Sequence, residues 1–203
     1  KKIKINDLKL RKNFLLNNYV LELTRTLSGS ADKLIIAPYF GFALLGNYQL
    51  GVQLLSLLTI IPVIVYQYTL PRDSKGEYNL KLKRLTIIVS IIIAIISFFV
   101  SPILIMKVFP KYLDAVDVVK IISFVIIPIT INLMYISEFL GKLKSKIVLM
   151  GSGIFLATQI PAIIILGEFM GITGIAAGLL LGSSAESIYL FLMKQKIQNL
   201  EKV

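Results

Sequence analysis

Apolar stretches of membrane-spanning length alternate with short polar segments along this chain. At a rise of about 1.5 Å per residue, a helix of roughly 20 apolar residues crosses a hydrocarbon core of about 30 Å. Segments that meet this requirement cover residues 15–36, 45–70, 85–106, 118–140, 147–166 and 172–193. The pattern predicts an all-α integral membrane protein that folds as a bundle of six transmembrane helices.

Lysine and arginine lie mainly in the short segments between these stretches. If the N-terminal segment is cytoplasmic, 17 of the 22 cations fall on that side, four fall on the other side, and Arg25 lies inside the membrane. Such an asymmetry orients membrane proteins with the cation-rich loops inside. We therefore expect a cytoplasmic basic connector at 1–14, a six-helix transmembrane lobe at 15–197 and a cytoplasmic tail at 198–203. The localisation that follows is the cell (cytoplasmic) membrane, multi-pass, with both termini cytoplasmic.

The amino-acid composition excludes several classes of function for this chain. Hydrophobic residues make up 56% of the chain, charged residues 16%, and the mean hydropathy is +0.82. A net charge of +11 would suggest nucleic acid in a soluble protein, but here the cations lie at membrane boundaries, so we expect membrane lipids and not nucleic acid as partners. The chain has no Cys and no His, which excludes thiolate nucleophiles, His bases and zinc sites with such ligands. We expect no enzyme activity, no cofactor and no metal.

The first segment carries a polar stripe. At about 100° per residue, its polar and small residues fall within about 80° of one another. They are Asn18, Glu22, Arg25, Gly29 and Asp32. A charge at mid-bilayer costs about 2.5 to 3.5 kcal/mol, so this face should look into a cavity, a bundle or a ligand. Alternatively, Glu22 and Arg25 neutralise each other structurally, and Asp32 and Lys33 form a pair at the interface.

The remaining segments add prolines and one Ile-rich block. Pro62, Pro128 and Pro161 lie inside three different segments, where each removes a backbone hydrogen bond and is expected to bend its helix. The block 85–106 has almost no polar atoms and is expected to face lipid over much of its circumference.

The last segment carries Gly174, Gly178 and Gly182, followed one turn later by Glu186. Small residues at this spacing let another helix approach closely, which predicts packing within the bundle. Glu186 lies near the middle of its segment and should be protonated, paired or in contact with water. A pairing with Arg25 and a core hydrogen bond to a neighbouring helix are both open.

Three local patterns together resemble the C-terminal half of polysaccharide flippases of the O-antigen type, the lipid-linked oligosaccharide exporters related to the MATE transporters. They are SADKLIIAPYFGFALLGNYQLGVQL from Ser30, VFPKYLDAVDVVKIISF from Val108 and MGITGIAAGLLLGSSAESIYLFL from Met170. The resemblance implies one lobe of a two-lobed MATE-like transporter, with an N-terminal six-helix lobe preceding this chain in the same protein. It also implies a role in polysaccharide biosynthesis, including that of lipopolysaccharide.

By this resemblance, the chain helps to flip polyprenyl-diphosphate-linked oligosaccharide across the membrane by alternating access. An Arg supplies a permanently charged fork for phosphate oxygens, and intramembrane acids commonly serve ion pathways. The implied substrate-binding residues are Arg25, Glu22, Asn18, Asp32 and Asn132. The candidates for binding a coupling ion are Glu186, Asp32 and Glu22.

Two other functions remain as alternatives. Cation-coupled efflux of drugs or metabolites would make the acids primary and Arg25 a structural partner. A membrane-embedded glycosyltransferase, polymerase or ligase would need catalytic acids or His in large external loops. The loops here are short, and only Glu168, Asp114 and Asp117 are acids near the outer face.

Overall fold

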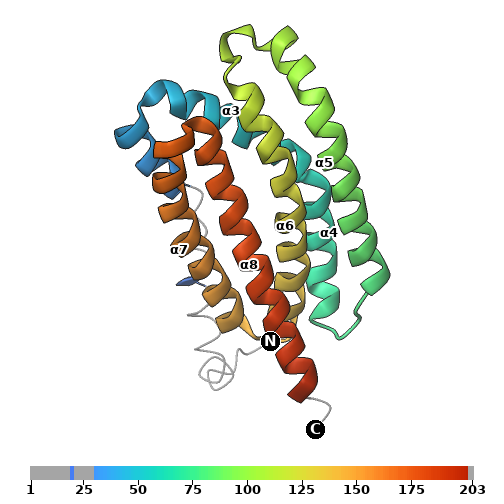
Figure 1. Ribbon diagram of the computed structural model, residues 1–203. Helices are drawn as coiled ribbons and strands as arrows, with labels where there is room; N and C mark the ends of the chain where they lie inside the picture. Colours follow the sequence, from blue (N-terminus) through green and yellow to red (C-terminus); the bar gives the residue numbers. More distant parts are fainter. Residues whose placement is uncertain (1–18, 21–29, 201–203) are drawn as a thin grey trace, which may run out of the picture.

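The computed structural model describes residues 19–20 and 30–200, and the structural statements below concern these residues. Every element formed within them is helical (Figure 1). A helical segment at 30–40 precedes the labelled elements. These are α3 (Phe42–Leu58), α4 (Ile60–Asp73), α5 (Leu80–Val108), the 3-10 turn η1 (Pro110–Tyr112), α6 (Ala115–Gly141), α7 (Ser145–Met170) and α8 (Ile172–Leu200).

The predicted spans from the second to the sixth coincide with helices. Within the described ranges, α5, α6, α7 and α8 are long and apolar enough to cross a membrane, and α3 with α4 makes a fifth span if the bent pair counts as one. The all-α class is therefore confirmed, and the helices are consistent with a multi-pass membrane protein. Most of the first predicted span, 15–36, lies outside the described residues, so the count of six remains a prediction.

The second span is broken where α3 meets α4, and the two helices are bent by 49°. Pro62 follows the break by one turn and has no N–H, so the carbonyl of Leu58 loses its helical donor. Thr59 lies at the junction, and its hydroxyl bonds back to the carbonyl oxygen of Leu55 at 3.0 Å. The bend expected at Pro62 is thus present, whereas α6 and α7 continue as single helices through Pro128 and Pro161.

Helix α6 is the centre of the bundle and packs against α3, α4, α5 and α8. In its most apolar 18-residue window 56% of the residues are buried, compared with 17% for α5. Large apolar side chains of α5 such as Ile92, Ile96 and Phe99 are exposed. This exposure agrees with the prediction that α5 faces lipid, because in water such a surface would drive aggregation.

Helices α7 and α8 pack along each other, and the glycines of α8 permit the close approach. A Cβ at Gly178 would lie 2.8 Å from Ile163 Cγ1 and 2.9 Å from the Ile163 backbone nitrogen. A Cβ at Gly182 would lie 2.9 Å from Gln159 Cβ. The predicted packing role of this glycine stripe is confirmed, and it fixes the side of α8 on which Glu186 can lie.

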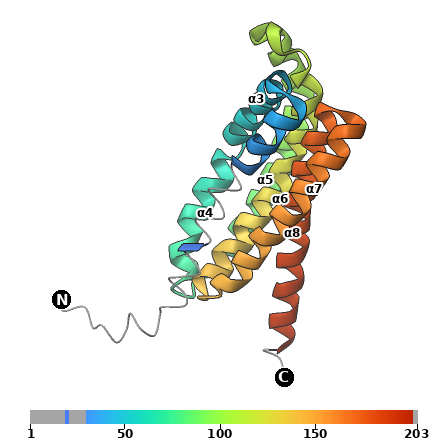
Figure 2. The ribbon, with the colours of Figure 1, turned by 90° about the vertical axis from the view of Figure 1, so that its left-hand side faces the viewer.

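Lysine and arginine residues are unevenly distributed between the two ends of the bundle. The α4–α5 and α6–α7 connections lie at the same end of the bundle as the last turns of α8, which extend past them (Figures 1 and 2). This end, called the cation-rich end below, carries Arg72, Lys75, Lys81, Lys83, Arg84, Lys142, Lys144, Lys146, Lys194 and Lys196. The opposite end carries Lys33, Lys107, Lys111 and Lys120. The fold therefore keeps the separation on which the predicted orientation rests.

Candidate functional site

A cavity of about 350 Å³ lies where α6, α7 and α8 meet. Figure 1 shows α8 lying between α6 and α7, and all three helices contribute residues to the lining of the cavity. The cavity, called the three-helix cavity below, is lined by Ile129, Asn132, Leu133, Ile136, Ser152, Phe155, Leu179, Ser183 and Glu186. Polar groups in an otherwise apolar lining of this kind are typical of a small binding site.

Two residues that the sequence singled out, Asn132 and Glu186, meet in this cavity. The Asn132 side-chain amide donates to Glu186 Oε2 at 3.0 Å and to the Ser183 carbonyl oxygen at 3.1 Å. The hydroxyl of Ser187 donates to Asn132 Oδ1 at 2.6 Å. Ser183, Glu186 and Ser187 are spaced i, i+3 and i+4 and so share one face of α8. The core hydrogen bond considered for Glu186 is present.

The side chain of Glu186 also lies against α7, next to Gly151. A Cβ at Gly151 would lie 3.5 Å from both Cγ and Oε1 of Glu186. These are ordinary van der Waals distances, so the side chain of Glu186 packs against α7 at Gly151. A carboxylate held inside a helical bundle attracts a proton, a metal cation or a cationic group, which makes Glu186 the main chemical feature of the cavity.

The carboxylate of Asp32 is hydrogen-bonded to Tyr48 and does not form the predicted interfacial ion pair with Lys33. It is buried, its Oδ2 accepts a hydrogen bond from the Tyr48 hydroxyl at 2.8 Å, and its Oδ1 accepts one from the backbone N–H of Lys33 at 2.8 Å. Within the described ranges no ion pair joins the side chains of Asp32 and Lys33, so the interfacial pair is not formed. The hydrogen bond with Tyr48 links the helical segment 30–40 to α3. Asp32 is not among the residues that line the three-helix cavity.

The other residues of the predicted polar stripe, Asn18, Glu22 and Arg25, lie outside the described residues. Their assignment to a substrate-binding face therefore stays a prediction. No group of three or more acidic residues within the described ranges is arranged to hold a metal ion.

A second polar cluster was not predicted, because Asp73 and Lys83 both lie between the predicted spans 45–70 and 85–106. Helix α4 continues through Pro71 to Asp73, and Asp73 Oδ2 lies 2.5 Å from Lys83 Nζ on α5 and 2.5 Å from Ser137 Oγ on α6. Ser137 Oγ is also 3.1 Å from Thr69 Oγ1. Asp73 is 1% exposed and Lys83 5%, so this buried ion pair joins three helices. The feature of the sequence that could have indicated this pair is an acid, Asp73, and a lysine, Lys83, on either side of a turn that contains Gly76.

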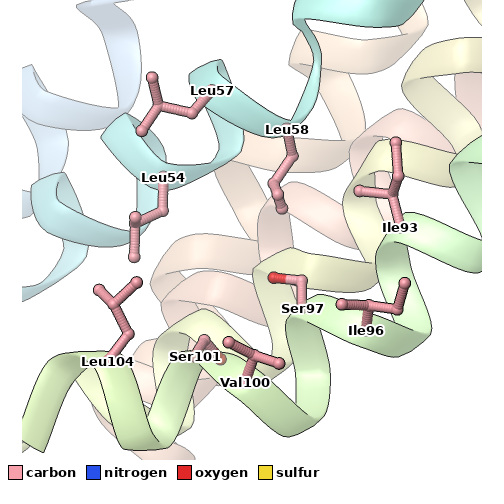
Figure 3. A pocket seen from close by; sticks show the side chains of 9 residues that line it. All are labelled: Leu54, Leu57, Leu58, Ile93, Ile96, Ser97, Val100, Ser101 and Leu104. Carbon is pink, nitrogen blue, oxygen red and sulfur yellow. The ribbon is translucent and has the colours of Figure 1, made fainter.

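An apolar groove of about 310 Å³ separates α3 from α5 (Figure 3). Leu54, Leu57 and Leu58 of α3 face the side chains of α5 across it, and the only polar residues in its lining are Ser97 and Ser101. The Ser97 hydroxyl is already hydrogen-bonded to that of Ser123 at 2.8 Å. Such a groove suits acyl chains and cannot compensate the charge of an anionic substrate.

Comparison with models of protein families, with curated proteins and with solved structures finds no match for this chain.

Proposed function

We propose that this chain is the C-terminal lobe of a two-lobed transporter that flips polyprenyl-diphosphate-linked oligosaccharide across the cytoplasmic membrane by alternating access. The observation that carries the proposal is the three-helix cavity, which places the amide of Asn132 and the carboxylate of Glu186 inside a bundle of membrane-spanning length. Polar groups at that depth are costly unless they serve a passage or a ligand.

The proposed division of roles follows from the chemistry of the substrate. Its diphosphate needs a permanent cation in a low-dielectric region, and Arg25 supplies one with a fork that fits phosphate oxygens. Amides and hydroxyls such as those of Asn132 and Ser152 provide hydrogen bonds for the glycan, while the polyprenyl tail stays in lipid. Glu186 holds the Asn132 amide in place. An N-terminal lobe would form the other wall of the passage.

The test is a flipping assay on the transporter that contains this chain, reconstituted in proteoliposomes with polyprenyl-diphosphate oligosaccharide. We expect Arg25→Ala to abolish flipping while insertion remains normal, and Asn132→Ala to reduce it. Lys120→Ala is the matched control, because the Lys120 side chain is 36% exposed and its ion-pair partner among the described residues is Asp117 at 3.0 Å. Flipping at the wild-type rate by Arg25→Ala would remove Arg25 from the substrate site and contradict the proposal.

One observation favours cation-coupled efflux as a second candidate: a carboxylate, Glu186, lines the three-helix cavity. In that case Glu186→Gln would abolish drug transport driven by a proton or Na⁺ gradient, because the amide cannot ionise. Under the flippase proposal, Glu186→Gln keeps a partner for Asn132 and should leave most flipping intact. Comparing the two substrates in one set of proteoliposomes separates the candidates.

A further inference from the structure

A pocket of about 380 Å³ lies at the cation-rich end, between α5, α6 and α8 and away from the three-helix cavity. Its lining combines basic, amide and apolar side chains. They are Leu80, Lys83, Arg84, Ile87, Ile131, Met134, Tyr135, Glu138, Phe191, Lys194, Gln195 and Gln198. We call it the basic pocket. Because α5 and α8 both pack on α6, a ligand here would contact all three helices.

The basic pocket keeps an excess of positive charge after its internal pairs are considered. Its single carboxylate, Glu138, is paired with Lys194 at 2.8 Å and with Lys142 at 3.3 Å. Lys83 is paired with Asp73. Arg84 is exposed, and its side chain makes no hydrogen bond or ion pair with another described residue. A guanidinium in this position is available for an anion, and it binds phosphate oxygens through two parallel hydrogen bonds.

Lys194 provides a second cation that a ligand can reach. Its Nζ lies 5.3 Å from the centre of the Tyr135 ring, and its side chain remains 22% exposed. The pairing with Glu138 and the aromatic ring hold the ammonium at the pocket without covering it. Gln195 and Gln198 follow on α8 and add neutral donors.

The remaining lining is apolar and continues outward along the helices. Leu80 is 50% exposed and Phe191 is 45% exposed. Beyond them, Ile88 on α5 and Ile188 on α8 are also exposed, and both lie farther from the cation-rich end. A ligand that fits this surface has an anionic head at the bundle end and apolar chains that run along α5 and α8 toward the membrane interior.

We propose that the basic pocket binds the head group of an anionic phospholipid from the leaflet at the cation-rich end. Basic pockets between transmembrane helices are a recurrent setting for such head groups, and each nearby cation contributes about 1 kcal/mol of attraction, or roughly fivefold in affinity. A free phosphate would use Arg84 and Lys194 but not the apolar lining. The lipid would bridge α5 and α8, which reach each other mainly through α6, and would stabilise this end of the lobe.

The chain has no Trp, so one introduced Trp reports on this site without background. Leu80→Trp places it at the pocket edge, and Phe191→Trp repeats the measurement from α8 in case the first variant folds poorly. Each variant is reconstituted in phosphatidylcholine containing a small fraction of dibrominated phosphatidylglycerol or dibrominated phosphatidylcholine, whose bromines quench nearby Trp. We expect the anionic lipid to associate about fivefold more strongly than the zwitterionic one.

Adding Arg84→Gln to the reporter should reduce this preference to near one. Lys81→Gln is the matched control, because Lys81 carries the same charge as Arg84, also lies near the start of α5 and does not line the pocket. Adding it to the reporter should leave the preference for the anionic lipid unchanged. Equal quenching by both lipids, or an equal loss in Lys81→Gln, would overturn the proposal. Relief of quenching by inorganic phosphate that depends on Arg84 would also overturn it and assign the site to a soluble anion.

Discussion

Neutralising Asp73 without changing its shape tests whether the buried ion pair holds α4, α5 and α6 together. In Asp73→Asn the side chain keeps a polar partner for Ser137, but the ammonium of Lys83 loses its counter-ion and keeps only neutral acceptors, such as the Met134 carbonyl oxygen at 3.4 Å. The change is isosteric so that the close packing of α4 on α6 is kept, since a Cβ at Gly141 would lie 2.8 Å from Asp73 Cβ.

The size of the effect follows from burial. Asp73 is 1% exposed and Lys83 5%, so removing one charge leaves the other without compensation in a region of low dielectric. Breaking a buried pair in this way costs about 3 to 5 kcal/mol of unfolding free energy. Lys83→Met, which keeps the length of the side chain, should cost a similar amount. The double variant Asp73→Asn/Lys83→Met contains no unpaired charge and should cost only about 1 kcal/mol.

The measurement is reversible unfolding in mixed micelles, with helical content followed by circular dichroism as sodium dodecyl sulfate is added to a mild detergent. The matched control is the exposed pair of Asp117 and Lys120, whose side chains are 66% and 36% exposed. Asp117→Asn and Lys120→Met should each cost less than about 1 kcal/mol. If the single variants at Asp73 and Lys83 resemble this control, or if the double variant costs the sum of the two, the reasoning is refuted.

Two further predictions concern helix contacts. Gly178→Ala should destabilise the bundle by about 1 to 3 kcal/mol in the same unfolding assay, because the added Cβ would lie 2.9 Å from the backbone nitrogen of Ile163. Tyr48→Phe should cost about 1 to 3 kcal/mol, because the buried carboxylate of Asp32 loses the hydroxyl that donates to it at 2.8 Å.

Each of these predictions has a control in the same chain. A Cβ at Gly153 on α7 meets no atom within 4 Å, so Gly153→Ala should be neutral or stabilising by up to about 1 kcal/mol through helix propensity. Tyr39 is exposed, and Tyr39→Phe should change stability little. An equal loss in both glycine variants would show that close approach of α7 and α8 is not the cause. Unchanged stability in Tyr48→Phe would show that the hydroxyl does not stabilise Asp32.

The all-α class and the positions of α5, α6, α7 and α8 were predictable from the amino-acid sequence. The requirement that an apolar segment reach across a bilayer is local, because it depends on the length and composition of one stretch. The segments 85–106, 118–140, 147–166 and 172–193 therefore lie within α5 to α8. The apolar, exposed surface of α5 and the packing role of the glycines in α8 were predictable for the same reason, since both follow from the side chains that one helix presents.

Which polar groups contact one another could not be predicted from the sequence and became visible only in the packed bundle. Asp32 is bonded to Tyr48 rather than to the side chain of Lys33, and Asp73 lies in the buried core instead of a loop. Asn132 and Glu186 were each noted in the sequence, but their hydrogen bond depends on how α6 and α8 are rotated and shifted against each other. That rotation is set by the combined packing of several helices, including the glycine contacts of α8 on α7. The length of an apolar segment carries no information about this rotation, because the length stays the same when the helix turns about its own axis.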